Sequence, residues 1–172
     1  MTFNSLLRVL VVTLTLMGTL TSAAARQDGV TIEPLLEVEL PAAAIPDGPV
    51  YVNLAHWTWE PDAKASIPAG AWQRGIVIDH VLSGSYTATS GENVLLVRGA
   101  AADSAEEIAP ETEFVVEAGV GAAYMQNAAT WEFRNSGDDA GAGIGGGIFS
   151  TAPPESEEPA EESGIGYEEL AR

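Results

Sequence analysis

Short apolar runs recur about every ten residues between positions 50 and 150, with Gly, Pro, Asn or Asp between them. The runs include VYVNLAHWTW, IVIDHVL, NVLLVRG, EFVVEAG, AAYMQ and TWEFRNSG, and the first alternates between two faces as a half-buried strand does. No stretch carries the periodicity of a long amphipathic helix. The pattern predicts an all-β fold, a sandwich or barrel of antiparallel strands.

Three segments interrupt this pattern or end it. PDAKASIPAG at 61–70 is rich in turn residues and predicts a connection between strands. AAADSAEEIAPETE at 100–113 contains Pro110 and predicts an inserted loop. GAGIGGGIF near position 145 lacks the strand-then-helix context and the Lys-Ser/Thr of a phosphate loop, so it predicts a glycine-rich loop and a last strand.

The N-terminus has the three regions of a secretory signal. Arg8 precedes an almost unbroken apolar run from Val9 to Leu20, and Ala23-Ala24-Ala25 offers a cleavage site. The run is shorter than the ~20 residues that span a bilayer, so we expect cleavage after Ala25 and no stable membrane span afterwards; an uncleaved anchor is the alternative. Residues 1–25 are therefore a predicted signal peptide, and the mature protein is expected to be secreted or held in the periplasm or cell envelope.

The chain is strongly acidic, and segments with few strand signals precede and follow the predicted barrel. The formal net charge is −18, with 7 Lys and Arg against 25 Asp and Glu, which argues against binding to nucleic acid. Residues 26–48 form a predicted N-terminal arm with one short strand at Leu35–Leu40. Residues 151–172 hold seven Glu, one Arg and three Pro, and predict an acidic disordered tail.

Residues 49–150 resemble the small single-domain cupins. The resemblance rests on two sequence patterns. HVLSG at 80–84 lies where that family commonly has a YVLEG-like strand end, and WEFRNSG at 131–137 lies where it commonly has HEFRNTG. It implies a cupin-type double-stranded β-helix, that is, a jelly-roll barrel, and it implies a binding site inside the barrel.

The metal-binding positions of that family are lost. If Gly84 closes the first motif, the glutamate position is Val77, and the two histidine positions fall in GAWQ at 70–73. In the second motif Asn135 fits the terminal asparagine, whereas the histidine position is Trp131. Neither Val nor Trp offers a lone pair to a metal. The resemblance therefore implies a barrel without metal, and we expect no cofactor.

The two histidines and Asp79 are the remaining candidates for chemistry. Strand alternation puts Val77 and Asp79 on one face and His80 on the other, so Asp79 and His80 cannot coordinate the same ion. The family's glutamate points inward, which implies that Asp79 faces the interior as a lone acid, with either a binding or acid–base role or hydrogen bonds near the barrel mouth. His80 and His56 are expected to be structural, with His80 on the surface or in a dimer interface.

Trp and amide side chains suggest a pocket. Trp57 and Trp59 are expected in the core or an interface, whereas Trp72 and Trp131 fall at or beside the former ligand positions. These aromatic side chains either wall a pocket for an apolar or sugar-like ligand or plug the cavity. The predicted ligand-binding residues are Trp72, Gln73, Asp79, Tyr124, Gln126 and Trp131, with Asn127 as a further polar candidate.

Three functions remain open. The first is a non-catalytic, metal-free exported barrel that binds a small molecule or a partner. The second is a metal-independent, isomerase-like enzyme with Asp79 as its acid or base. The third is a structural protein of the cell envelope that forms a homodimer through a sheet face.

Overall fold

The computed structural model describes residues 25–27, 30–32, 39, 45–98, 105–126, 129–135, 137–152 and 161–171. Within residues 1–33, strands β1 (Ala25–Gln27) and β2 (Val30–Ile32) pair as a small antiparallel sheet. All but the last residue of the predicted signal peptide lies outside the described residues, as does nearly all of the predicted strand at 35–40.

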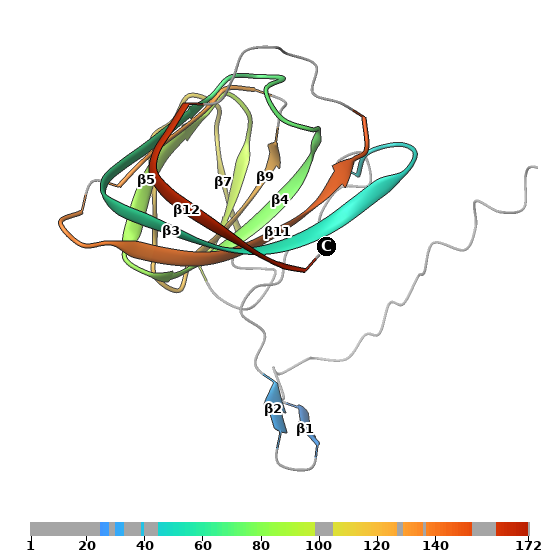
Figure 1. Cartoon of the computed structure of the whole chain (residues 1–172), viewed down its shortest axis with the longest axis horizontal. Coiled ribbons are helices and arrows are strands. Elements are labelled where there is room, and N and C mark those ends of the chain that lie inside the picture. Colours follow the sequence, from blue (N-terminus) through green and yellow to red (C-terminus); the bar gives the residue numbers. More distant parts are fainter. Residues whose placement is uncertain are drawn as a thin grey trace, which may run out of the picture. The chain divides into compact units, whose positions relative to one another are not determined.

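The remaining strands form one antiparallel sheet that curls into a nearly closed barrel (Figure 1). The strand order is β7-β6-β9-β4-β11-β3-β10-β5-β8, and β12 pairs with β3. The bounds are β3 (Val50–Ile67), β4 (Gly75–Ser83), β5 (Ser85–Ser90), β6 (Val94–Val97), β7 (Ala105–Ile108), β8 (Phe114–Glu117), β9 (Gly121–Gln126), β10 (Trp131–Arg134), β11 (Gly141–Ser150) and β12 (Glu161–Ala171). The predicted all-β class and the predicted barrel are confirmed.

Backbone hydrogen bonds join β4 to the turn between β8 and β9. The N–H of Gly119 donates to the carbonyl of Val81 at 2.9 Å, and the N–H of Val81 donates to the carbonyl of Val120 at 3.0 Å. A further bond of 3.0 Å runs from the N–H of Ala118 to the carbonyl of Gly84. These bonds tie the last strand in the order, β8, back to the middle of the sheet and narrow the opening of the barrel.

Strand β3 is much longer than expected because it continues through the predicted connection at 61–70. Its first part pairs with β11 up to Trp59, and its last part pairs with β10 from Lys64 to Ile67. Asp62 lies between the two parts with φ of 63°, a left-handed conformation that lets the strand change direction. The prediction of a connection at 61–67 is therefore wrong, and the turn begins only at Pro68.

Two further segments differ from expectation. Ala105–Ile108, placed in an inserted loop, forms the edge strand β7 on β6. Within the tail that was predicted to be disordered, Glu161–Ala171 forms β12, which lies along β3. In that pairing Ile165 is opposite Trp59 and Tyr167 is opposite Trp57, and Ile165 packs against the hydrophobic core.

The core of the barrel consists of side chains that alternate inward along each strand. Trp59, Val81, Tyr86, Leu96 and Val116 are almost completely buried. Trp59 anchors them to the backbone, because its indole Nε1 donates to the carbonyl of Ser85 at 3.0 Å. The expectation that Trp59 belongs to the core is confirmed.

Over the part of the chain that is described, no helix is both long and apolar enough to cross a membrane.

Candidate functional site

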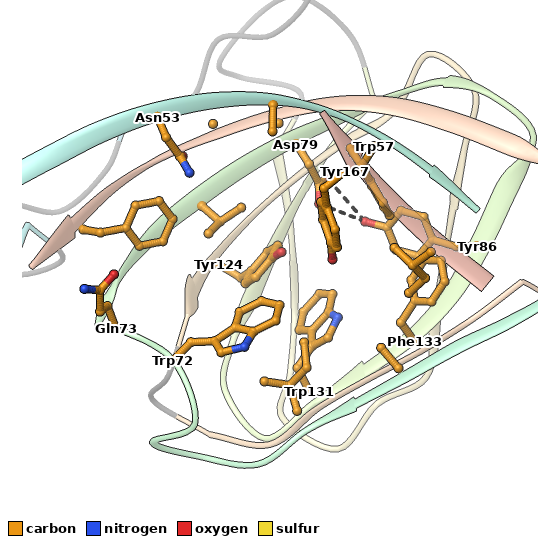
Figure 2. Close-up of a pocket in the computed structure, with 18 of the residues that line it drawn as sticks. Asn53, Trp57, Trp72, Gln73, Asp79, Tyr86, Tyr124, Trp131, Phe133 and Tyr167 are labelled. Atoms are coloured by element: carbon orange, nitrogen blue, oxygen red, sulfur yellow. Dashed lines mark hydrogen bonds between the residues drawn. The ribbon is translucent and has the colours of Figure 1, made fainter. Parts of the chain in front are cut away.

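The interior of the barrel contains a cavity of about 460 Å³. Its wall combines side chains from several strands with the turn that precedes β4 (Figure 2). The lining residues are mostly aromatic or small: Tyr51, Asn53, Ala55, Trp57, Ala65, Ile67, Trp72, Gln73, Val77, Asp79, Tyr86, Tyr124, Trp131, Phe133, Gly145, Gly146, Phe149, Ile165 and Tyr167. Such a volume lies in the range of small-molecule pockets, so bulky side chains do not plug this barrel.

Five of the six side chains predicted to bind a ligand line this one cavity. Trp72 and Gln73 come from the turn before β4, Asp79 from β4, Tyr124 from β9 and Trp131 from β10. They are distant in sequence and are brought together by the curl of the sheet. The sixth predicted residue, Gln126, ends β9, and its side chain lies outside the described residues, as does Asn127.

Strand β11 provides the space. It lies between β3 and β4, and Gly145 is opposite Ala55 on one side and Asp79 on the other. A Cβ at Gly145 would lie 3.3 Å from the Cβ of Asp79, and one at Gly146 would lie 2.8 Å from the carbonyl oxygen of Asn53. Glycine keeps this wall thin, which leaves room for the aromatic rings opposite. The predicted strand is confirmed here, but it includes the segment that was expected to be a glycine-rich loop, and it is not the last strand because β12 follows it.

Aromatic rings form the rest of the wall. Tyr124 and Trp131 are stacked with ring centroids 4.1 Å apart and an interplanar angle of 17°. Trp57 lies 5.5 Å from Tyr86 and 5.7 Å from Phe133, again between ring centroids. Rings that hold one another in this way present fixed faces to the cavity, and a ligand need not order them on binding.

The two ends of the cavity differ in polarity. Figure 2 shows Asp79 and Tyr86 at one end and Asn53 and Gln73 at the other. Gln73 accepts a hydrogen bond from the hydroxyl of Tyr51, which fixes its amide at the wall. A molecule in this cavity would therefore meet an acid at one end, amides at the other and rings between them.

Asp79 is held by two neutral donors. Its side chain is 5% exposed. The hydroxyl of Tyr86 lies 3.3 Å from each carboxylate oxygen, and the N–H of Ala122 donates to Oδ1 at 3.2 Å. Burial raises the pKa of Asp79 from its ordinary value of 3.8 to about 7, although the hydrogen bonds from Ala122 and Tyr86 act in the opposite direction. Asp79 can thus change charge near neutral pH.

The tyrosines around Asp79 stay protonated. Burial, followed by the charge of Asp79, raises the pKa of Tyr86 and of Tyr124 well above the ordinary value of 10.0. Both hydroxyls are therefore neutral hydrogen-bonding groups at physiological pH.

His80 lies apart from this site, as strand alternation predicts, but it is not at the surface. It is absent from the cavity wall, and it is only 9% exposed on a strand that pairs with β9 and β11. Its Nδ1 has no hydrogen-bond partner among the described residues, and burial lowers its pKa. The prediction of an exposed His80 is wrong, since a strand inside a sheet can bury both of its faces.

His56 is partly buried on β3 and lies opposite Ile144, which in turn lies opposite His80. Among the described residues, no group of three or more His, Cys, Asp or Glu could hold a metal ion. The absence of a metal remains a prediction.

Sequence reasoning missed several residues of the wall. Trp57 lines the cavity, whereas it was expected in the core or an interface, and Tyr86, Asn53 and Tyr167 were not considered. Period-2 alternation along β3 could have found Asn53 and Trp57, because both share a face with Trp59, which was expected in the core or an interface. Tyr167 gives no such signal, since its position depends on a pairing between segments about 110 residues apart.

Comparison with models of known protein families, with curated protein sequences and with solved structures found no match.

Proposed function

We propose that this protein is a small-molecule-binding barrel whose cavity takes a compact, ring-containing or otherwise largely apolar ligand. The observation that carries the proposal is the 460 Å³ cavity, which is walled by aromatic rings and has polar groups at each end. Apolar walls with a few placed polar groups are typical of ligand sites, in which the walls supply affinity and the polar groups supply orientation.

A neutral two-ring fluorophore, N-phenyl-1-naphthylamine, tests the proposal directly. We expect saturable binding of one fluorophore molecule per chain, which is measured by the increase in the fluorescence of the fluorophore. Asn53→Phe should weaken the affinity at least tenfold, because Asn53 lines the cavity and phenylalanine would fill part of it. Val52→Phe is the matched control, since Val52 is the preceding residue of β3 and is 59% exposed. Binding that is absent, or equally affected by both substitutions, would contradict the proposal.

We further propose that the barrel is a degenerate cupin-type jelly roll. In the register of the resemblance, the former ligand positions are Val77, Trp131 and the GAWQ segment with Trp72 and Gln73, and all four side chains line the one cavity. This convergence is what cupin motifs would produce, since their ligands meet inside the barrel. A solved structure whose strands follow a different order from the jelly roll would overturn this assignment.

Export and self-association complete the proposal and have separate tests. The signal-like sequence at 1–25 supports a secreted, periplasmic or envelope location, which fractionation and N-terminal sequencing of the mature protein would test. The outward residues Val52 and Leu54 of β3, 59% and 39% exposed, support a homodimer through a sheet face. Light scattering after gel filtration would test the dimer, and a monomeric mass at micromolar concentration would exclude it.

A metal-independent enzyme is the second candidate, and one observation favours it. Asp79 has a pKa of about 7 and lies beside two neutral tyrosines, an arrangement suited to moving a proton to or from a bound substrate. If the wild-type protein turns over a substrate, the Asp79→Asn variant should not turn it over. Turnover that survives this substitution would remove the enzyme hypothesis.

A further inference from the structure

We propose that the ligand of this cavity is an organic cation, a ring-bearing amine or quaternary ammonium whose positive group pairs with Asp79. This inference rests on the proposed binding function and names the chemical class of the ligand. It comes from Asp79, the one carboxylate among the described residues of the wall, from the absence of Lys, Arg and His among those residues, and from the aromatic faces beside Asp79.

The first argument is the hydrogen-bonding capacity of Asp79. An ionised carboxylate has about four acceptor sites, and here the described contacts are one hydroxyl proton shared between its two oxygens and one backbone N–H. Among the described residues that line the cavity, none is Lys, Arg or His. A buried carboxylate without a cation is unfavourable, and a positive group on the ligand would supply the missing charge.

The second argument is the aromatic surround. Tyr86, Trp57 and Tyr124 line the cavity around Asp79, and Tyr167 lies in front of it in Figure 2. The faces of such rings carry negative potential and attract ammonium groups, most strongly where water is excluded. An anionic ligand would gain little from this arrangement, because its negative group would meet the carboxylate of Asp79 and the negative faces of the rings.

The third argument is the charge of the whole chain. With a formal net charge of −18, the surface repels anions and raises the local concentration of cations. The carboxylate inside the cavity and the electrostatic field outside it therefore both favour cations over anions.

Binding of a permanent cation should depend on pH with a defined sign. The titratable side chains that line the cavity with Asp79 are Tyr86 from β5, Tyr124 from β9, Tyr51 from β3 and Tyr167 from β12, and β11 contributes glycine. Tyr86 and Tyr124 stay neutral up to pH 8, because burial raises the pKa of both hydroxyls, whereas Asp79 changes charge in this range. A quaternary ammonium ligand should bind roughly 30-fold more tightly at pH 8 than at pH 5.5, since the competent ionised form is about 3% populated at the lower pH.

The experiment uses pairs of ligands that differ in charge alone. Trimethylammonium compounds with one to three methylene groups between ring and nitrogen are compared with their neutral carbon isosteres, in which a tert-butyl group replaces the trimethylammonium group. Affinities are measured by displacement of N-phenyl-1-naphthylamine at pH 5.5 and pH 8, in the full chain. We expect the cation of the best pair to bind at least tenfold more tightly than its isostere at pH 8 and to lose this preference at pH 5.5.

Asp79→Asn is the test variant, and Asp138→Asn is its control, because Asp138 is an exposed acid outside the cavity. The preference for the cation should disappear in Asp79→Asn and persist in Asp138→Asn. If the neutral isosteres bind as well as the cations in the wild-type protein, the inference is wrong and the binding function stands. If neither series nor the fluorophore binds, both proposals fail.

Discussion

Replacing Asp79 by Asn should stabilise the protein at and above neutral pH. The side chain is 5% exposed, and its partners are the hydroxyl of Tyr86 and the N–H of Ala122. Asparagine has nearly the same shape and keeps an oxygen that can accept from both donors. The substitution therefore removes the buried charge and leaves the packing and most of the hydrogen bonding in place.

The magnitude follows from the raised pKa. In the unfolded chain the group has its ordinary pKa of 3.8, whereas in the folded protein the pKa is about 7. As pH rises through this window the unfolded state loses its proton first, so the free energy of unfolding falls between about pH 4 and pH 7 and then levels off. At about 1.4 kcal/mol for each pKa unit, the cost of ionised Asp79 above pH 7 is about 4 kcal/mol.

Urea unfolding followed by tryptophan fluorescence at pH 5, 6, 7 and 8 measures this cost. The stability gap between Asp79→Asn and wild type should grow by roughly 2–3 kcal/mol from pH 5 to pH 8. Asp138→Asn, which removes an exposed charge, controls for the reduction in net charge. A gap that is constant across this range, or that shrinks as pH rises, would refute a raised pKa for Asp79.

Three further substitutions test other parts of the barrel. Asn135→Ala should lower the free energy of unfolding by about 2–4 kcal/mol in a urea titration, because a side chain that is 4% exposed donates to two backbone carbonyls and accepts from one N–H. Gly141→Ala should cost at least about 2 kcal/mol in the same assay, since its Cβ would overlap the buried indole of Trp59. Tyr167→Ala should change stability by less than about 1 kcal/mol, because Tyr167 is 58% exposed, yet weaken fluorophore binding several-fold; unchanged binding would show that β12 is no part of the site.

Local alternation made the inner wall largely predictable from sequence. In β4 the pattern correctly placed Val77 and Asp79 together, away from His80, because side chains on a strand alternate whatever the partner strands are. Trp72 and Trp131, which also line the cavity, were placed there by the resemblance to cupins and not by the strand period, since Trp72 lies in the turn before β4. Placing Val77 and Asp79 on one face required only the strand period.

Features that depend on distant pairing could not be predicted. Composition alone makes 161–171 a solvated acidic segment, and its order comes from pairing with β3, which supplies backbone hydrogen bonds and a face for Ile165. The burial of His80 was likewise not predictable, because alternation gives the face of a side chain but not what covers that face. Turn residues misled at Asp62, where a left-handed residue bends β3 without ending it.

The open cavity depends on the contrast between its two walls, one of aromatic rings and one of glycine. Trp131 and Trp72 are bulky, and aromatic side chains on every wall of a barrel would fill its interior. Here the opposite wall is β11, whose Gly145 and Gly146 present backbone to the cavity. Gly145 shares the inward face with Ala55 and Asp79, so the lack of a side chain there leaves part of the space of about 460 Å³ open. The cavity therefore depends on the glycines of β11 as well as on the aromatic wall. A side chain at Gly145 would reduce the space in which Asp79 could contact a ligand.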